Sequence, residues 1–194
     1  MSTQDKQIKQ HLYIKNMVCD RCKASVKQLL EALQISVYAL HLGDVVVGPI
    51  AAETYPILKK KLQNIGFELI TSEDDVLIEQ IKTVLIETLD VSENQNMKIS
   101  ELLTQKIPKD YSVLSKFFSK RMGITIEKYV IQLKIEKVKE LLQLGQLQFT
   151  EIADSLGYTS SSHLANQFKS ITGMSMSDYK ASQQWDRKTI DKII

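Results

Sequence analysis

The chain has 194 residues, of which 43% are hydrophobic and 25% are charged, and its formal net charge is +2 at pH 7. This length and composition fit two compact folded units and exclude a polycation. No apolar run approaches the ~18 residues of a membrane span, and the start lacks the apolar segment of a secretion signal, so we expect a cytoplasmic protein without a membrane partner. The two cysteines, Cys19 and Cys22, are too few for a disulfide framework and indicate one local site.

The first 73 residues predict a small unit with the element order βαββαβ. Apolar periodicity indicates a strand, a helix, two strands, a helix and a strand, in that order, over residues 11–14, 24–33, 37–42, 45–47, 53–64 and 67–70. Gly43 and Asp44 form a typical hairpin turn between the second and third strands, and Gly66 ends the second helix. This order is that of the ferredoxin-like split βαβ fold.

The cysteine pair lies between the first strand and the first helix, in the motif Met17-Val-Cys19-Asp-Arg-Cys22. Two thiolates three positions apart can point at one ion, and soft sulfur ligands select soft ions such as Cu(I). The nearby helix start and Arg21 both favour the thiolate form. With this motif and Gly66-Phe-Glu, residues 11–71 resemble the heavy-metal-associated domain of copper chaperones and copper-pumping ATPases. The resemblance implies that Cys19 and Cys22 bind Cu(I) or another thiophilic metal, and that Met17 is a buried prop for the loop.

Other interpretations of the cysteine pair stay open. It could act as a redox switch, although the rest of the thioredoxin-like pattern is absent. A zinc site would need two further ligands, and neither His11 nor His41 has a useful spacing to the pair. The pair could also be a structural remnant in a partner or dimerisation module. As a further class of function, the chain could be a metal carrier that uses its C-terminal part for docking.

Residues 74–96 predict an amphipathic helix and a short connector. Acidic residues 73–75 stand where the helix begins, and an apolar stripe follows at Ile78, Ile81, Leu85 and Leu89. Residues 92–96 are the most loop-like stretch of the chain and indicate a turn between helices. We expect the stripe to pack on the following domain rather than on a second protomer.

From residue 97 onward the sequence repeats itself at an offset of fifty residues without a gap. The matched pairs are Glu101 and Glu151, Ser112 and Ser162, Leu114 and Leu164, Phe118 and Phe168, Gly123 and Gly173, and Tyr129 and Tyr179. A fixed period indicates one supersecondary unit used twice. Each copy predicts a short helix, a turn, a second helix and a glycine stop, and a long helix over 129–142 joins the copies.

The predicted fold class is therefore α+β. A ferredoxin-like βαββαβ domain is expected over residues 1–73 and the helical connector over 74–96. An all-α domain with two helix-turn-helix units is expected over 97–194.

Residues 97–180 resemble the DNA-binding domain of the AraC/XylS family of bacterial regulators. The motifs that carry the resemblance are Ile99-Ser-Glu-Leu-Leu, Leu114-Ser-Lys-Phe-Phe, Gly123-Ile-Thr-Ile-Glu-Lys-Tyr, Glu151-Ile-Ala-Asp-Ser-Leu-Gly-Tyr and Phe168-Lys-Ser-Ile-Thr-Gly-Met-Ser-Met-Ser-Asp-Tyr-Lys. The chain departs from the family at Lys134 and Val138, where Arg and Ala are common, and at Met176, where Pro is usual. The resemblance implies a regulator that binds double-stranded DNA and is not an enzyme. Contact with RNA polymerase and homodimerisation are left open.

The second helix of each copy is expected to present a polar face to DNA. Lysine can reach guanine acceptors, Asn and Gln can pair with adenine, and Ser can serve either base. Residues 97–134 hold eight basic and three acidic side chains, a local charge of +5 that suits a phosphate backbone. The expected contact residues are Lys109, Ser112, Ser115, Lys116, Lys120, Ser161, Ser162, His163, Asn166, Gln167 and Lys169.

Within that set, Lys116 and Asn166 are expected to touch bases. Phosphates are expected at Lys109, Lys120 and Lys169. The first copy holds most of the basic charge and the second has few charges, so we expect affinity and specificity to be distributed unequally along the DNA. The sequence as a whole predicts a transcription regulator whose N-terminal domain biases DNA binding in response to a thiophilic metal.

Overall fold

The computed structural model describes residues 8–89, 97–190 and 193. The chain divides into two compact units, residues 1–83 and 84–194, with the border inside helix α3 (Glu73–Glu87). The sequence-based division assigned nearly all of this helix to a separate connector, whereas the structure gives one part of it to each unit. The loop expected over 92–96 lies outside the described residues.

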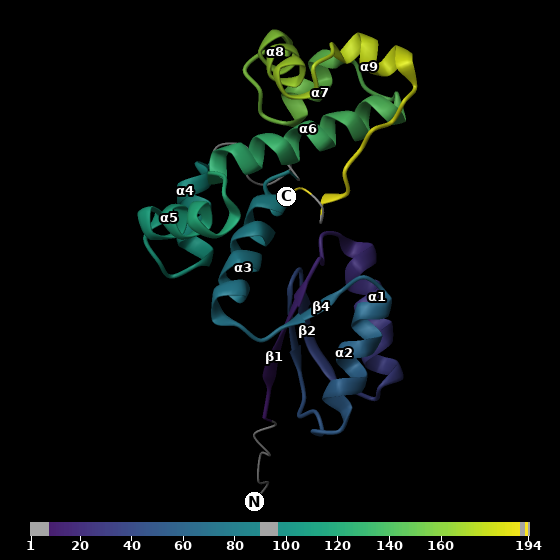
Figure 1. Cartoon of the computed structure of the whole chain (residues 1–194), viewed down its shortest axis with the longest axis vertical. Coiled ribbons are helices and arrows are strands. Elements are labelled where there is room, and N and C mark those ends of the chain that lie inside the picture. The colour runs from purple at the N-terminus through teal and green to yellow at the C-terminus, as the bar shows by residue number, and fades with distance from the viewer. Residues whose placement is uncertain (1–7, 90–96, 191–192, 194) are drawn as a thin grey trace, which may run out of the picture. The chain divides into compact units, whose positions relative to one another are not determined.

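The described part of the first unit contains a four-stranded antiparallel sheet, two complete helices and the first part of α3 (Figure 1). Its elements are, in chain order, β1 (Gln10–Lys15), α1 (Asp20–Ala32), β2 (Val37–His41), β3 (Asp44–Val47), α2 (Thr54–Asn64) and β4 (Glu68–Ile70). The strands lie in the order β2-β3-β1-β4, and each neighbouring pair is antiparallel. The element order βαββαβ is the one expected from the sequence.

Alternate strand residues build the core of this unit. Helices α1 and α2 cover the same side of the sheet (Figure 1). Leu12 and Ile14 of β1 are buried on this side. His11 and Tyr13 point to the opposite face, where their rings stack with centroids 5.9 Å apart. The buried residues that fill the core from the remaining elements include Val26, Leu30, Val45, Val47, Leu58 and Leu62. The first unit thus has a hydrophobic core of its own.

Helix α1 begins four residues earlier than the apolar pattern indicated. It starts at Asp20, and Cys19 is its N-cap with an extended backbone (φ −160°, ψ 171°). An acidic residue in the first turn favours a helix start, but it contributes nothing to an apolar stripe. Consequently Cys22 lies in the first helical turn and not in the preceding loop.

The second unit is helical in its described part. It comprises the end of α3 followed by α4 (Ile99–Lys106), α5 (Tyr111–Met122), α6 (Ile126–Leu144), α7 (Phe149–Ser155), α8 (Ser161–Thr172) and α9 (Met176–Ser182). An ion pair joins Lys106 of α4 to Glu87, in the last turn of α3. The packing of the apolar stripe of α3 on this domain stays a prediction. No helix among the described residues is long and apolar enough to cross a membrane.

The repeat in the sequence is a repeat in the structure. Helices α5 and α8 begin and end at positions fifty residues apart, and each ends at a glycine in the left-handed region, Gly123 (φ +73°) and Gly173 (φ +81°). Glycine tolerates this conformation without the steric cost that a Cβ imposes. The same supersecondary unit, a helix ended by glycine and followed by another helix, therefore occurs twice.

The two copies have cores of the same kind. Leu114 and Phe118 of α5 are fully buried, and the Phe118 ring meets that of Tyr129 edge to face at 5.5 Å. Their counterparts at fifty residues, Leu164, Phe168 and Tyr179, repeat this arrangement, also with rings 5.5 Å apart. Helix α6, longer at both ends than expected, has α4 and α5 beside one end and α7, α8 and α9 beside the other (Figure 1).

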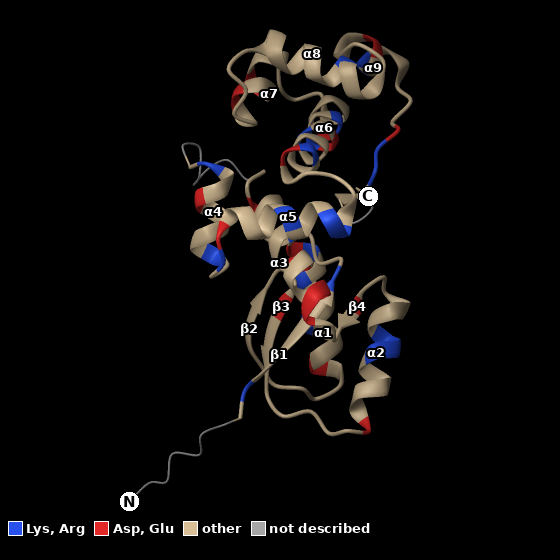
Figure 2. Cartoon of the chain, turned by 60° about the vertical axis from the view of Figure 1, so that its left-hand side comes forward, with Lys and Arg blue, Asp and Glu red and all other residues tan. Residues whose placement is uncertain are grey.

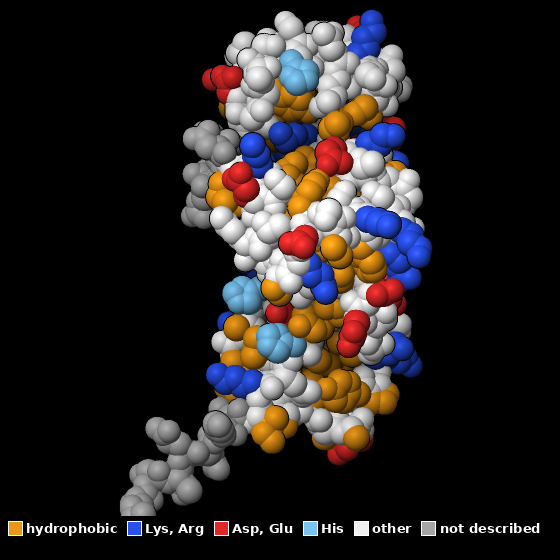
Figure 3. Space-filling view, turned by 90° about the vertical axis from the view of Figure 1, so that its left-hand side faces the viewer, with side chains coloured by type: hydrophobic (Ala, Val, Ile, Leu, Met, Phe, Trp, Pro, Cys, Tyr) orange, Lys and Arg blue, Asp and Glu red, His pale blue; other side chains and the backbone are white. Residues whose placement is uncertain are grey.

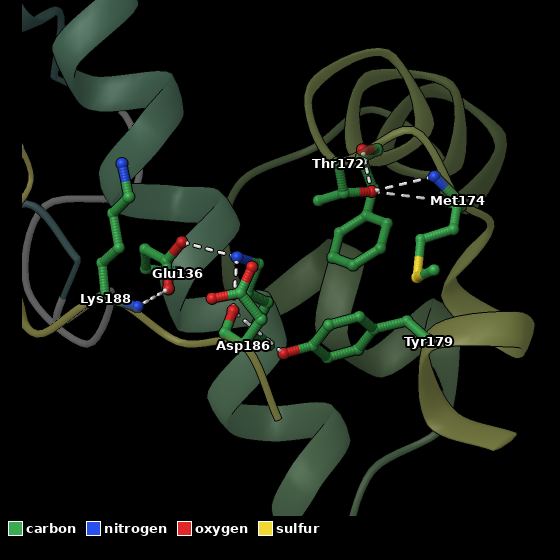
Figure 4. Close-up of polar contacts among 8 residues, drawn as sticks. Glu136, Thr172, Met174, Tyr179, Asp186 and Lys188 are labelled. Carbon is green, nitrogen blue, oxygen red and sulfur yellow. Dashed lines mark hydrogen bonds and ion pairs between the residues drawn. The ribbon is translucent and has the colours of Figure 1, made fainter. Parts of the chain in front are cut away.

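The residues after α9 fold back on α6 (Figure 4). Lys139 donates to the Asp186 carbonyl (2.7 Å) and to Glu136 Oε1 (2.8 Å), and the Lys188 N–H donates to Glu136 Oε2 (2.8 Å). Glu136 and Lys139 are buried, with only 9% and 8% of their surface exposed. Trp185 packs on the core of the second copy. We call residues 183–190 the tail.

A pocket of about 400 Å³ lies beside the tail. Met174, in the turn between α8 and α9, lines it, and the Thr172 hydroxyl bonds to both the N–H and the carbonyl of that residue. Glu136 and Lys139 of α6 line another part, where they bind the backbone of the tail. The tail is thus part of the packed second unit.

Candidate nucleic-acid interface and cysteine pair

Helix α5 presents a polar, basic face. Ser112, Lys116 and Lys120 are exposed and follow one another at intervals of four residues, so they lie along one side of the helix. Lys109, just before the helix, is also exposed. Ser115 is half-buried and lies at the edge of this face.

Helix α8 presents the corresponding face in the second copy. Ser162, His163, Asn166 and Lys169 are exposed, and Ser161 is half-buried at the first position of the helix. The spacing of three and four residues between them places them on neighbouring parts of one surface. The sequence-based set of contact residues therefore lies mainly on the outer sides of α5 and α8. Their role in DNA contact stays a prediction.

The side chain of Gln167, another expected contact, has a hydrogen-bond partner within the protein. It is half-buried, and its Oε1 accepts a hydrogen bond from the Tyr158 hydroxyl at 2.6 Å. Burial raises the pKa of Tyr158 to about 12, so its hydroxyl remains a donor at neutral pH. This hydrogen bond occupies one of the two acceptor positions of the Gln167 oxygen and holds the side chain toward Tyr158.

The start of α8 is fixed by a side-chain cap. Ser160 is the N-cap, and its hydroxyl accepts the N–H of His163 at 3.1 Å. The ring of His163 also has two neighbours. Its Nδ1 lies 3.3 Å from the Thr159 hydroxyl, and the Tyr158 ring meets it edge to face at 5.4 Å. These contacts hold the imidazole in one orientation at the N-terminal end of the helix.

The start of α5 is fixed by a different contact. The Tyr111 hydroxyl donates to Glu127 Oε1 at 2.6 Å and so ties the first residue of α5 to the first turn of α6. Burial, with Glu127 beside it, raises the pKa of Tyr111 to about 12, and the same hydrogen bond lowers the pKa of Glu127. Local sequence patterns do not reveal this pair, because a contact between residues sixteen apart leaves no periodicity.

Lys134, one of the positions that depart from the family pattern, has a structural role. Its ammonium donates to the Leu156 carbonyl at 2.6 Å and lies 5.1 Å from the centre of the Tyr158 ring. Burial lowers the pKa of Lys134. Lys134 therefore joins α6 to the turn that precedes α8.

Charge is distributed unequally between the two faces. Helix α5 holds three basic and no acidic residues, whereas α8 holds the single basic residue Lys169 and no acidic one. Figure 2 shows blue segments on α5 and a mostly tan α8. In the space-filling view, the upper part of the picture is mostly white, the colour of the backbone and of uncharged polar side chains (Figure 3). The first copy can therefore contribute more phosphate attraction than the second.

The cysteine pair lies at the start of α1. The two sulfur atoms of Cys19 and Cys22 are 3.3 Å apart, and both residues are half-buried. Met17 is 3% exposed and belongs to the core, as expected of a prop for this loop. In the described ranges, no group of three or more His, Cys, Asp or Glu side chains is arranged to hold a metal ion. The candidate site consists of the two sulfurs.

The two thiols differ in acidity. At Cys19, burial opposes ionisation, but hydrogen bonds from the Cys22 backbone and thiol and from the Arg21 backbone, with the Arg21 charge, lower the pKa below its usual value. At Cys22, burial and the neighbouring Cys19 raise the pKa. Cys19 is thus the sulfur that ionises first, and it lies at a helix N-cap, where negative charge is favoured.

Comparison with known proteins identifies the domain that contains α5 and α8. Residues 104–182 match a family model described as "Helix-turn-helix domain". The chain is 28% identical over 82 residues to the Msm operon regulatory protein of Streptococcus mutans, covering 42% of this chain and 30% of that protein. It is 26% identical over 110 residues to the probable transcriptional regulator LumQ of Photobacterium leiognathi, covering 55% and 43%.

A solved structure is also similar. The C-terminal domain of AraT, a response regulator from Geobacillus stearothermophilus, is 19% identical, with a TM-score of 0.48 over 58% of this chain and 89% of that one. The chain spans less than half the length of the two curated relatives, 30% and 43%. The matched family model confirms that the C-terminal half contains a helix-turn-helix domain.

Proposed function

We propose that the chain is a sequence-specific DNA-binding transcription regulator whose C-terminal domain is of the AraC/XylS type. The observation that carries this proposal is the doubled unit, in which α5 and α8 expose matching faces from matching positions. The regulatory names of both curated relatives support the same class. In a helix-turn-helix, the second helix lies in the major groove and its N-terminal residues contact base edges.

The connecting helix supports a bipartite site on one DNA face. Helix α6 has 19 residues, which corresponds to a length of about 28 Å. Successive major grooves on one face are about 34 Å apart. A rigid connector of this size can hold α5 and α8 at adjacent grooves, so one copy of the chain would cover two half-sites.

Selection of duplexes from a random pool by the full chain, followed by footprinting, tests this function. We expect an enriched sequence with two protected segments about one helical turn apart.

Lys116→Ala should then weaken binding by ~1–3 kcal/mol at one base position, since lysine at a base edge discriminates by about that amount. Lys60→Ala, which removes an exposed charge from the first unit, is the matched control. An equal loss on all sequences would show that Lys116 contacts the backbone and not a base.

For the first unit, we propose a ferredoxin-like fold of the heavy-metal-associated type whose cysteine pair binds Cu(I) or another thiophilic metal and biases DNA binding. The βαββαβ order and the antiparallel order β2-β3-β1-β4 support the fold. Cys19 and Cys22 are half-buried, their sulfur atoms lie 3.3 Å apart, and the pKa of Cys19 is lowered. Such a pair fits a soft ion. Zinc requires four ligands in a structural site, and the pair supplies two.

Chelator competition with Cu(I) tests the metal site. The full chain should take up one equivalent, and the Cys19→Ser/Cys22→Ser variant should take up none, while His11→Ala should bind as the unchanged chain does. DNA affinity measured with and without Cu(I) should differ only when both cysteines are present. Equal uptake by the double variant would refute the site.

A redox switch is the second candidate for the pair. A disulfide would require Cys19 and Cys22 to close from 3.3 Å to about 2.04 Å. Thiol counting after equilibration with glutathione buffers would detect it as a loss of both free thiols at a potential found in the cytosol.

As a regulator, the chain would also contact RNA polymerase. Sedimentation of the DNA complex would show whether one copy or two bind a site.

A further inference from the structure

Val113 is an exposed apolar residue in the first turn of α5. It keeps 52% of its surface exposed, whereas the next residue, Leu114, is fully buried. A β-branched side chain loses rotamer freedom in a helix and regains stability through packing. Half of the Val113 side chain therefore remains open for an apolar contact with a partner.

The repeat gives this position a counterpart and a direction. Val113 corresponds to His163, which is also exposed and lies in the first turn of α8. Lys116 and Lys120 follow Val113 by three and seven residues, so all three side chains project from the same side of α5. Val113 thus lies within the basic face that the proposed function directs into the major groove, at the N-terminal end that meets base edges.

We propose that Val113 contacts the 5-methyl group of a thymine in the DNA site. The inference rests on the proposed function and adds a residue that determines specificity. A valine side chain has no hydrogen-bond donor or acceptor, so it would leave a phosphate or a polar base edge unsatisfied. The thymine methyl is the apolar group that the major groove displays, and small apolar side chains are its usual partners. The basic side chains beside Val113 supply the attraction that brings this apolar contact to the duplex.

Replacing thymine by uracil tests the contact because this change removes one methyl group and preserves pairing with adenine. The probe is the duplex selected by the full chain, with uracil substituted at each thymine in turn, and affinity is measured by fluorescence anisotropy. At one position under α5, we expect uracil to weaken binding about fourfold, the value of one buried methyl-sized group. Val113→Ala removes both γ-methyl groups and should clearly reduce the difference between the thymine and uracil duplexes at that position.

Two matched variants separate this role from an effect on folding. Val113→Thr keeps a γ-methyl group and should retain the preference for thymine. His163→Ala changes the counterpart in α8 and should leave the preference at the α5 position unchanged. Val113→Ala replaces an exposed residue by a better helix former, so the helical content of the chain should not fall.

The outcomes distinguish this inference from the function on which it rests. If no duplex is enriched, the proposed function and the thymine contact are both wrong. If a duplex is enriched but uracil has no effect under α5, the thymine contact alone is wrong. The same conclusion follows if Val113→Ala remains as sensitive to uracil as the unchanged chain.

Discussion

Replacing Glu136 by alanine should destabilise the second unit by about 3 kcal/mol, because the change leaves the charge of Lys139 buried without its carboxylate. In the structure, Lys139 lies 2.8 Å from Glu136 Oε1, and Glu136 Oε2 accepts the N–H of Lys188 at 2.8 Å. The substitution therefore removes an ion pair and one of the hydrogen bonds that hold the tail.

The magnitude follows from how completely the pair is buried. Removing one partner of a buried pair costs roughly 3–5 kcal/mol. We take the lower end, because the Lys139 and Glu136 side chains keep 10% and 11% of their surface and Lys139 retains the Asp186 carbonyl at 2.7 Å. Replacing both charges, as Glu136→Leu with Lys139→Met, should cost less than the single change, since no charge is then left without a partner.

Urea unfolding followed by tryptophan fluorescence measures this cost in the full chain. Trp185 is the only tryptophan of the sequence, and it lies in the tail at 5.7 Å from the Tyr179 ring, so its emission reports on the second unit. Glu140→Ala is the matched control. Glu140 lies on the same helix and pairs with Lys137 and with Arg187 of the tail, but about a third of its side chain is exposed, so its loss should cost at most ~1 kcal/mol.

Two results would refute the reasoning. If Glu136→Ala costs no more than Glu140→Ala, the tail does not cover the pair. If the double replacement costs more than Glu136→Ala alone, the unpaired charge of Lys139 is not the source of the loss.

Three further outcomes follow from the contacts that position α5 and α8. Tyr111→Phe removes the hydrogen bond to Glu127 and should cost ~1 kcal/mol of stability. Because the pKa of Tyr111 is raised to about 12, this contribution should be complete below pH 10 and should disappear as the pH rises through 12. Unfolding measured at pH 8 and pH 11.5 would show the difference. Lys134→Met, which removes the donor to the Leu156 carbonyl, should cost ~1–3 kcal/mol by leaving a buried acceptor unpaired, whereas Lys134→Arg should restore most of it in thermal unfolding. Gly123→Ala should cost ~1 kcal/mol through the left-handed backbone alone, since a Cβ there meets no atom within 4 Å, and an equal Tm for both proteins would contradict this.

Much of the candidate interface was predictable because it depends on local rules. The spacing of Leu114 and Phe118 fixes which side of α5 is buried, and the opposite side must then be exposed. The same rule exposes Lys116 and Asn166. It could not show that Gln167 is held by Tyr158, because that hydrogen bond depends on how the turn before α8 folds.

The start of α1 shows a second limit of periodicity. The apolar pattern begins after the first turn, so it placed the helix start at residue 24, and the structure places it at Asp20. The difference moves Cys22 from a loop into a helix and makes Cys19 the N-cap. The distance between the two sulfurs, 3.3 Å, depends on this backbone path and could not be obtained from their spacing in the sequence.

The sequence by itself determined the doubled helix-turn-helix, because helix length, the buried stripe and the glycine stops are properties of neighbouring residues, repeated at an offset of fifty. Only the tertiary structure decided that Glu136 and Lys139, which local patterns place at the surface of α6, are almost completely buried. They are buried because the tail, about fifty residues further along the chain, supplies a carbonyl and an N–H as their partners. Paired in this way, two charges can leave water at a cost that the fold sustains.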